Sequence, residues 1–262
     1  MLCSNGTAEA GDPFDSAMEN AIRLDVSPDP EQMALRAAGW FAERIAATTD
    51  IFRVALSGGS TPRRLYQQLA SAEYRERIEW RRVAFFWGDE RFVPHTDPRS
   101  NYRMVRETLL VRAPVLIDHI HPIITEGDPA SAAHRYEALL KTIYGSDSLS
   151  QGNPLFHLVL LGLGEDGHTA SLFPGSPVLR EQSRWVAEAS GRDEPRITLT
   201  YPAIGSNCAV AFLVAGEDKA DIVRRVVRTG DIALPAARVH SEGEVVWFLD
   251  AAAASQIDTS RK

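Results

Sequence analysis

Leu155–Pro177 reads LFHLVLLGLGEDGHTASLFPGSP, in which an apolar run from Phe156 to Leu163 gives way to glycines, to Asp166 and to His168. An apolar run of this length, bounded by turn residues, predicts a strand that is buried on both faces, as in a parallel sheet. In open α/β sheets, ligands bind beyond the carboxyl ends of such strands. Because His168 follows the end of the predicted strand, it is expected to lie in a functional site.

The glycines of this stretch also match the dinucleotide-binding fingerprint G-x-G-x-x-G, at Gly162, Gly164 and Gly167. That fingerprint requires a helix to begin at the third glycine and to present its N-terminus to a pyrophosphate. Pro174 and Pro177 leave little room for such a helix, since a proline inside a helix costs about 3 kcal/mol. The context therefore favours glycines that form loops, and no organic cofactor is expected.

His168 allows two interpretations. A lone histidine beside a glycine is often only a turn residue or a helix cap. Asp166, two positions earlier, offers a carboxylate that would fix the tautomer of the imidazole and raise its basicity. Spacing alone leaves both interpretations open, and the other motifs of the chain have to distinguish a catalytic base from a turn residue.

The composition excludes several classes of protein. The chain has 262 residues, of which 44% are hydrophobic and 24% charged, as in soluble globular proteins. A net charge of −7 argues against a nucleic-acid partner, because no basic patch offsets it. The N-terminus lacks the basic start and apolar core of a signal peptide, and no segment approaches the roughly 18 apolar residues of a membrane span.

The cysteines point to a reducing compartment. Cys3 lies in a polar stretch and Cys208 in an apolar one, so the two are not expected to form a disulfide. Neither has a C-x-x-C partner, which argues against a zinc or redox site. We therefore expect a cytoplasmic protein, a monomer or small homo-oligomer, that binds neither nucleic acid nor membrane.

A second motif follows the short apolar strand Phe52–Leu56. The next residues include Gly58, Gly59, Ser60 and Thr61, with Thr61 expected to cap a helix and the following proline to take its first position. A strand, a glycine turn and a helix N-terminus together form an anion site, because backbone N–H groups and the helix dipole favour negative charge. The alternative is a tight turn that needs glycine for its geometry alone.

Three cationic residues lie at the ends of other predicted elements. Arg91 follows strand Val83–Trp87, and its planar guanidinium suits a phosphate or carboxylate, although an Asp-Glu-Arg run is also common in surface turns. Arg196 begins a strand, and Lys219 lies in the first turn of a helix, against the dipole preference. His119 and His121 lack the further ligands that a metal site needs, so no metal is expected.

Strands alternate with helices along the chain, which predicts one doubly wound α/β domain with a mainly parallel sheet flanked by helices. We expect this domain over residues 19–255, after a loose tail at 1–18 and before a polar tail at 256–262, with a final helix starting at Asp250. Polar clusters follow several strands, at 57–61, 89–91, 166–168 and 217–219. Because parallel strands end at the same edge, these clusters are expected to converge, as in an enzyme.

Taken together, the motifs resemble those of the 6-phosphogluconolactonases of the pentose phosphate pathway. They are spread in order over nearly the whole chain: Leu56–Pro62 (LSGGSTP), Trp87–Pro94 (WGDERFVP), Ser100–Tyr102 (SNY), Gly162–Pro174 (GLGEDGHTASLFP), Arg196–Thr200 (RITLT), Gly216–Lys219 (GEDK) and Trp247–Asp250 (WFLD). The resemblance implies the sheet fold shared with amino-sugar phosphate deaminases and ribose-5-phosphate isomerase.

The resemblance also implies an activity, the hydrolysis of 6-phospho-D-glucono-1,5-lactone to 6-phosphogluconate. It assigns the general base to His168, oriented by Asp166, and assigns the phosphorylated lactone to the loop Gly58–Thr61 together with Arg91, Arg196 and Lys219. It implies no metal and no organic cofactor, and its only partner is the small phosphorylated substrate.

Two alternatives belong to other functional classes. Amino-sugar phosphate deaminases also contain Asp-Gly-His, but there the following residues typically run to Asn-Glu-Pro, whereas here they are Thr-Ala-Ser-Leu-Phe-Pro. The carboxylate for aldose–ketose proton transfer is therefore missing from its expected place. A non-catalytic sugar-phosphate sensor would need a DNA-binding segment, which the sequence does not contain.

Overall fold

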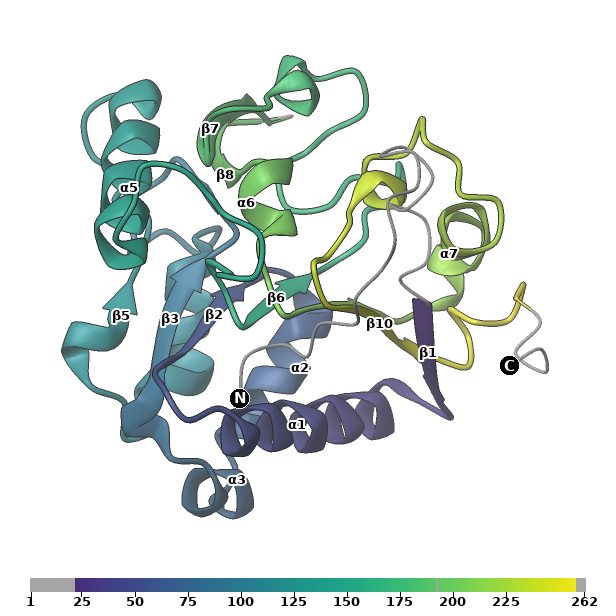
Figure 1. Cartoon of the computed structure of the whole chain (residues 1–262). Helices are drawn as coiled ribbons and strands as arrows, with labels where there is room; N and C mark the ends of the chain where they lie inside the picture. Colours follow the sequence, from purple (N-terminus) through teal and green to yellow (C-terminus); the bar gives the residue numbers. More distant parts are fainter. Residues whose placement is uncertain (1–21, 192, 258–262) are drawn as a thin grey trace, which may run out of the picture.

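The computed structural model describes residues 22–191 and 193–257, and these form a three-layer α/β fold (Figure 1). The central sheet is parallel throughout, in the order β1-β10-β9-β6-β2-β3-β5. Its strands are β1 (Ile22–Ser27), β2 (Phe52–Leu56), β3 (Val83–Trp87), β5 (Ile120–His121), β6 (Leu158–Leu161), β9 (Ala209–Val214) and β10 (Glu244–Asp250). The expected fold class is confirmed.

A second, smaller sheet is antiparallel and has the order β4-β8-β7. It consists of β4 (Asp89–Arg91), β7 (Val186–Ser190) and β8 (Pro195–Leu199). Neither this sheet nor the strand β4 was expected, because Asp-Glu-Arg has none of the apolar or β-branched residues that predict a strand. The β4 strand forms because it pairs with β8, which supplies its backbone hydrogen-bond partners. The β8 strand is buried at Ile197, Thr198 and Leu199.

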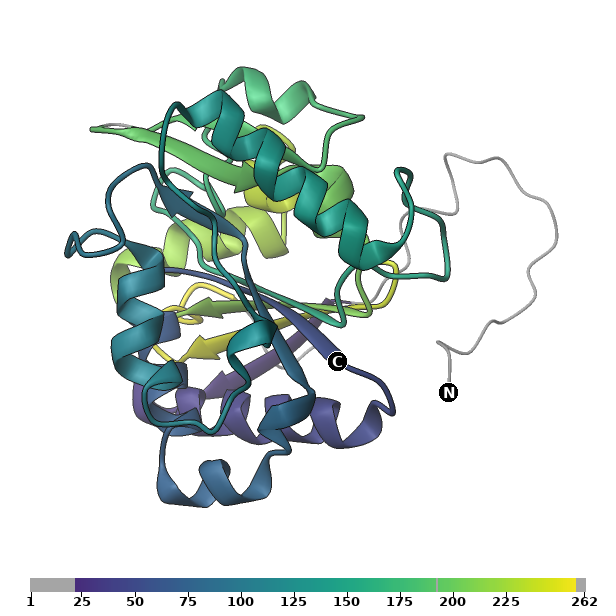
Figure 2. The ribbon, with the colours of Figure 1, turned by 90° about the vertical axis from the view of Figure 1, so that its left-hand side faces the viewer.

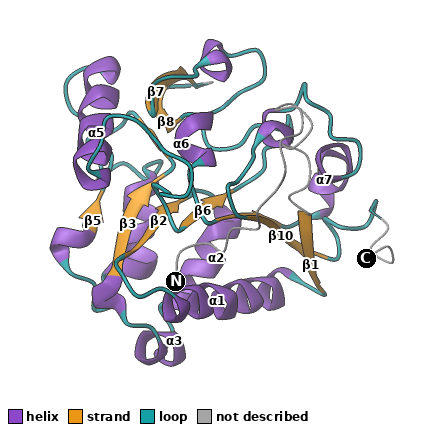
Figure 3. Ribbon diagram, viewed as in Figure 1, coloured by secondary structure: helices purple, strands orange, loops and turns teal. Residues whose placement is uncertain are grey.

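Helices cover both faces of the central sheet (Figures 1 and 2). The helices are α1 (Pro30–Ala47), α2 (Ser60–Leu69), α3 (Ala72–Arg77), α4 (Asn101–Val105), α5 (Pro129–Tyr144), α6 (Tyr201–Gly205) and α7 (Ala220–Val227). In both views α1, α2 and α3 lie on one side of the sheet, and α5, α6 and the small sheet lie on the other. Figure 3 separates helices from strands in the same orientation. No helix among the described residues is long and apolar enough to cross a bilayer.

The sequence pattern accounts for most of these elements. The β6 and β9 strands are buried along their whole length, as the continuous apolar runs predict. Ser100 caps α4 as expected, with its side chain accepting a hydrogen bond from the backbone N–H of Arg103. The helix then continues as a π-helical turn over Arg106–Leu110.

Other boundaries differ from the expectation. The β1 strand begins at Ile22, in a segment where no strand was expected, and it pairs with β10 at the edge of the sheet. The helix expected from Asp250 is wrong, and residues 251–256 form turns instead. The Asp250 side chain accepts hydrogen bonds from the backbone of Gly216 and Ala253, which holds this segment against the sheet. The tail expected at 1–18 lies outside the described residues, and so does the tail expected at 256–262 except for residues 256 and 257.

The order of the strands reverses between β2 and β6. From β2 the chain adds β3 and β5 toward one edge, and from β6 it adds β9 and β10 toward the other. Loops that leave two such neighbouring strands diverge to opposite faces and open a crevice at their carboxyl ends. The segments after β2 and β6 are the glycine loop at 57–59 and the loop that carries His168.

Tyr66, completely buried on α2, ties that helix to the end of β2. Its hydroxyl donates to the carbonyl of Ser57 at 2.7 Å and accepts from the N–H of Ser57 at 3.1 Å. Because buried backbone groups need partners, this hydroxyl satisfies two groups at the point where the glycine loop begins.

We therefore expect Tyr66→Phe to reduce the free energy of unfolding by about 1–3 kcal/mol, the cost of leaving buried polar groups without a partner. Tyr74→Phe is the matched control, since the Tyr74 hydroxyl lies at 3.4 Å from its acceptor, the carbonyl of Leu35. Denaturant unfolding of both variants measures the difference. Equal stability of the two variants would contradict the assignment.

Candidate functional site

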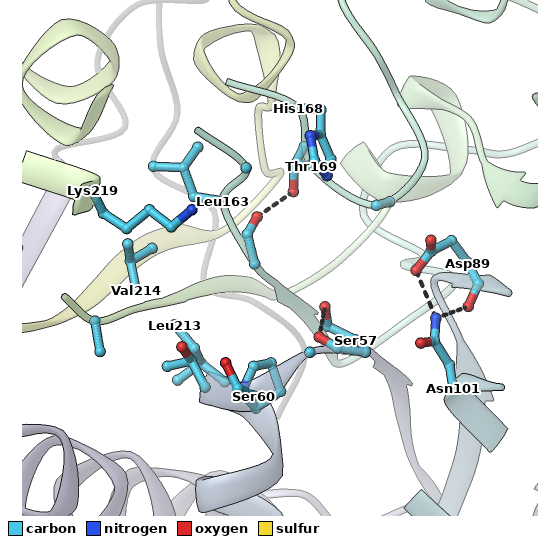
Figure 4. A pocket seen from close by; sticks show the side chains of 18 of the residues that line it. Ser57, Ser60, Asp89, Asn101, Leu163, His168, Thr169, Leu213, Val214 and Lys219 are labelled. Carbon is cyan, nitrogen blue, oxygen red and sulfur yellow. Dashed lines mark hydrogen bonds between the residues drawn. The ribbon is translucent and has the colours of Figure 1, made fainter. Parts of the chain in front are cut away.

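A cavity of about 220 Å³ opens at the reversal of the strand order (Figure 4). The polar clusters that follow the strands converge on it, as expected. Every predicted site residue except Asp166 lines its wall, namely Gly58, Gly59, Ser60, Thr61, Arg91, His168, Arg196 and Lys219. The polar residues Ser57, Asp89, Asn101 and Thr169 also line it, and the prediction did not include them as site residues.

The glycine loop presents the N-terminus of α2 to the cavity. Gly59 is the N-cap with φ of 105°, a conformation that favours glycine, and Ser60 is the first residue of the helix. The expectation that Thr61 caps and that proline comes first is wrong by two positions, because the turn at Gly59 already starts the helix. No side chain caps α2, so its first N–H groups keep their hydrogen-bonding capacity for a ligand.

His168 and Asp166 form a direct pair. The Nδ1 atom of His168 lies 2.5 Å from Oδ1 of Asp166, and the backbone N–H of His168 donates to the same oxygen at 3.1 Å. Burial by itself raises the pKa of Asp166, but these hydrogen bonds from His168 outweigh it and bring that pKa below its ordinary value. An ionised carboxylate only accepts, so Nδ1 carries the proton and Nε2 keeps a lone pair.

The loop around His168 is closely packed. A Cβ atom on Gly164 would lie 2.1 Å from Nδ1 of His168, so only glycine fits beneath the imidazole. The Thr169 hydroxyl donates to the carbonyl of Gly162 at 2.8 Å, and the backbone N–H of Ala236 donates to the carbonyl of Gly167 at 3.0 Å. These contacts hold the imidazole at one place on the cavity wall.

Arg91 and Arg196 lie opposite each other on the paired strands β4 and β8. The Nε atom of each is buried and has no hydrogen-bond partner among the described residues. Burial lowers the pKa of Arg196, and the nearby Asp89 carboxylate partly offsets this effect. Guanidinium groups with unused donors at a cavity are suited to an anionic ligand.

Asp89 and Asn101 connect the two sheets beside the cavity. The Asn101 amide nitrogen donates to the Asp89 carboxylate at 3.2 Å, and its oxygen accepts from Nη1 of Arg91 at 3.0 Å. The hydroxyl of Ser171 donates to Asp89 at 2.6 Å. Asp89 and Asn101 both belong to motifs that are visible in the sequence. The sequence does not show, however, whether the side chain of such a residue points into the cavity or away from it.

Lys219 stands at another part of the cavity. It ends a short 3₁₀ helix just before α7, and its Nζ lies 3.7 Å from the Glu165 carboxylate and 3.6 Å from that of Asp218. In Figure 4 Lys219 and the pair Asp89–Asn101 lie on opposite sides, with His168 on the wall between them. Because Arg91 contacts Asn101, cationic side chains line the cavity on both of these sides.

Residues 168–176, which follow the fingerprint glycines, form turns rather than the helix that a dinucleotide site requires.

His121 stacks on Phe86, with ring centroids 4.8 Å apart. Among residues 22–191 and 193–257, no group of three or more histidine, cysteine or acidic side chains is arranged to hold a metal ion.

Curated proteins of known name are similar to this chain in sequence. The 6-phosphogluconolactonase of Nostoc sp. is 39% identical over 210 residues, 79% of this chain and 85% of that protein. The 6-phosphogluconolactonase of Streptomyces coelicolor is 35% identical over 257 residues, 93% of this chain and 97% of that protein.

Solved structures have the same fold. The devB protein superimposes with a TM-score of 0.82 and 32% identity, covering 90% of this chain and 100% of that one. The Trypanosoma brucei 6-phosphogluconolactonase gives 0.77 and 28%, over 92% of this chain and 100% of that one. A monomeric glucosamine-6-phosphate deaminase, at 20% identity, shares the fold with a TM-score of 0.76. Residues 28–247 match one family throughout, and the chain belongs to the glucosamine-6-phosphate isomerases/6-phosphogluconolactonase family.

Proposed function

We propose that this protein hydrolyses 6-phospho-D-glucono-1,5-lactone to 6-phosphogluconate, in the oxidative pentose phosphate pathway, the activity for which its relatives are named. One observation carries the proposal. His168, which is paired with Asp166, lines the same cavity as an uncapped helix N-terminus and several cationic side chains. A base and an anion site at one cavity suit a phosphorylated substrate that is attacked by water.

His168 acts as the general base. The Nε2 lone pair takes a proton from water as the water oxygen attacks the lactone carbonyl carbon, a contribution of typically 10²–10⁴ in rate. When the tetrahedral intermediate collapses, the bond between that carbon and the ring oxygen breaks, and the imidazolium returns the proton to the ring oxygen. Asp166 stabilises the imidazolium between these steps, because its carboxylate accepts from Nδ1 throughout.

The phosphorylated lactone is bound by the N-terminus of α2 in the loop Gly58–Thr61, by Arg91 and Arg196, and by Lys219 on the other side of the cavity. Anchoring a group remote from the reacting carbon supplies binding energy that positions the lactone ring against the water. The unused Nε–H donors of the two arginines support this assignment, because a buried donor without a partner is costly unless a ligand satisfies it.

The deaminase alternative needs a carboxylate that is free to move protons between sugar carbons. Asp89, from the polar cluster at 89–91, is the carboxylate among the described residues that line the cavity. Its oxygens already accept hydrogen bonds from Ser171 and Asn101, and Arg196 lies 4.0 Å away. These contacts favour a carboxylate that orients its neighbours over one that moves protons between sugar carbons.

We expect His168→Ala to lower kcat by about 10²–10⁴, because it removes the base. Hydrolysis of the lactone above its spontaneous rate measures the effect, and His134→Ala, on the exposed side of α5, is the matched control. Circular dichroism should show an unchanged fold. Wild-type rates in His168→Ala would move the base elsewhere, and an inactive wild type would favour the deaminase.

Lys219→Ala is expected to raise KM tenfold or more with a smaller change in kcat. The reason is that an interaction made equally strongly with the bound substrate and with the transition state affects KM rather than kcat when it is lost. Steady-state kinetics measures both parameters. Lys141→Ala is the control, because Lys141 pairs with Glu137 and does not line the cavity. An unchanged KM would show that Lys219 does not contribute to binding of the phosphorylated substrate.

Gly58→Ala tests the packing of the glycine loop. A Cβ at Gly58 would lie 1.9 Å from Oδ1 of Asn101, so Asn101 must move and release Arg91. We expect kcat/KM to fall at least tenfold, an amount typical of small displacements in an active site. Gly39→Ala is the control, because its Cβ makes only an ordinary 3.6 Å contact with the Tyr74 hydroxyl. Full activity in Gly58→Ala would contradict the assignment.

A further inference from the structure

Glu90 is a buried carboxylate that the proposed reaction does not use. It lies in the middle of β4, between Asp89 and Arg91, and is only 1% exposed. Its two neighbours line the cavity, whereas Glu90 itself does not. A charged side chain is rarely buried to this extent without a specific set of partners.

Four donors surround this carboxylate. Oε1 accepts from the backbone N–H of Arg91 at 2.8 Å and from that of Asn101 at 2.7 Å. Oε2 accepts from the backbone N–H of Tyr102 at 2.7 Å and from the hydroxyl of Ser100 at 3.0 Å. Glu90 therefore joins β4 to the first residues of α4, at the point where Asn101 enters the cavity wall.

Asn101 carries this constraint to the site. Its backbone is held by Glu90, and its side chain links Arg91 to Asp89 and packs directly on Gly58. The Asn101 side chain thus contacts the small sheet and the glycine loop of the large sheet. A shift of the α4 start would move all these contacts together.

The negative charge of Glu90 is costly to bury. Burial raises the pKa of Glu90 to about 7, even though the hydrogen bonds from Tyr102, Asn101, Arg91 and Ser100 act in the opposite direction. The ionised form is therefore held at a cost in folding free energy above neutral pH. Glutamine has nearly the same shape and no charge, but its amide nitrogen would face at least one N–H donor that needs an acceptor.

We propose that Glu90 is a positioning residue for this active site, which holds Asn101 and, through it, Arg91 and the glycine loop in the arrangement that binds the substrate. The inference rests on the proposed lactone hydrolysis. Glu90 does not line the cavity, and the proposal assigns its effect on the reaction to its hold on Asn101, whose side chain does. That route distinguishes it from a residue that only stabilises the fold.

A double-mutant cycle tests the route. Glu90→Gln and Asn101→Ala should each lower kcat/KM for the lactone at least tenfold, and the two together should be no worse than the more severe single variant, because both disturb one unit. Effects that multiply would show that Glu90 acts independently of Asn101 and would overturn the inference.

The control is Asp25→Asn, which alters another buried carboxylate. Asp25 lies on the edge strand β1 and is paired with Arg36 through two bonds of 2.6 Å. Its loss should lower the melting temperature and leave kcat and KM unchanged. If Glu90→Gln behaves in the same way, with altered stability and wild-type kinetics, Glu90 is structural only.

A second variant keeps the test decisive if Glu90→Gln does not fold. Ser100→Ala removes one of the four donors and leaves the carboxylate, so kcat/KM should fall at least threefold. Unchanged kinetics would overturn the inference.

A wild type without lactonase activity would refute the proposed function instead. In that case the affinity of the protein for inorganic phosphate, measured by calorimetry, tests the role of Glu90. Glu90→Gln should weaken this affinity at least tenfold, and an unchanged affinity would refute the inference.

Discussion

The reversal of strand order between β2 and β6 is the constraint on which the rest of the structure depends. The segments that follow the two parallel strands at this point leave toward opposite faces of the sheet. The strand order alone therefore opens a crevice at the carboxyl ends of these strands. The groups of the proposed reaction reach that crevice from several separate segments of the chain. The fold therefore supplies the location, and the residues that follow the strands supply the chemistry.

An acidic protein that binds an anion has to concentrate its positive charge. The chain carries a net charge of −7, yet its cavity collects Arg91, Arg196, Lys219 and the positive end of α2. The small antiparallel sheet makes this possible, because it sets the two arginines opposite each other. The buried carboxylates Asp89 and Glu90 lie on the same sheet, and Arg196 lies 4.0 Å from the Asp89 carboxylate and 3.4 Å from that of Glu194.

Close packing keeps the catalytic loop in one conformation. Gly164 lies beneath the His168 ring and Gly167 contacts Leu234, and a Cβ at either glycine would collide with its neighbour. The glycines that resemble a nucleotide fingerprint are therefore explained by packing and loop geometry. Asp166 needs the same arrangement, because its carboxylate reaches Nδ1 only when the chain turns back within two residues.

The sequence by itself determined most of the elements and many of the residues that line the site. Continuous apolar runs identify β6 and β9 because burial on both faces requires them, and glycine turns at their ends mark the loops. Only the tertiary structure decided that Asp89, Glu90 and Arg91 form a strand, since their polar side chains carry no strand signal and the hydrogen bonds come from β8. It also decided that Asn101 joins Gly58 and Arg91, because contacts between distant segments depend on how the layers pack rather than on local sequence.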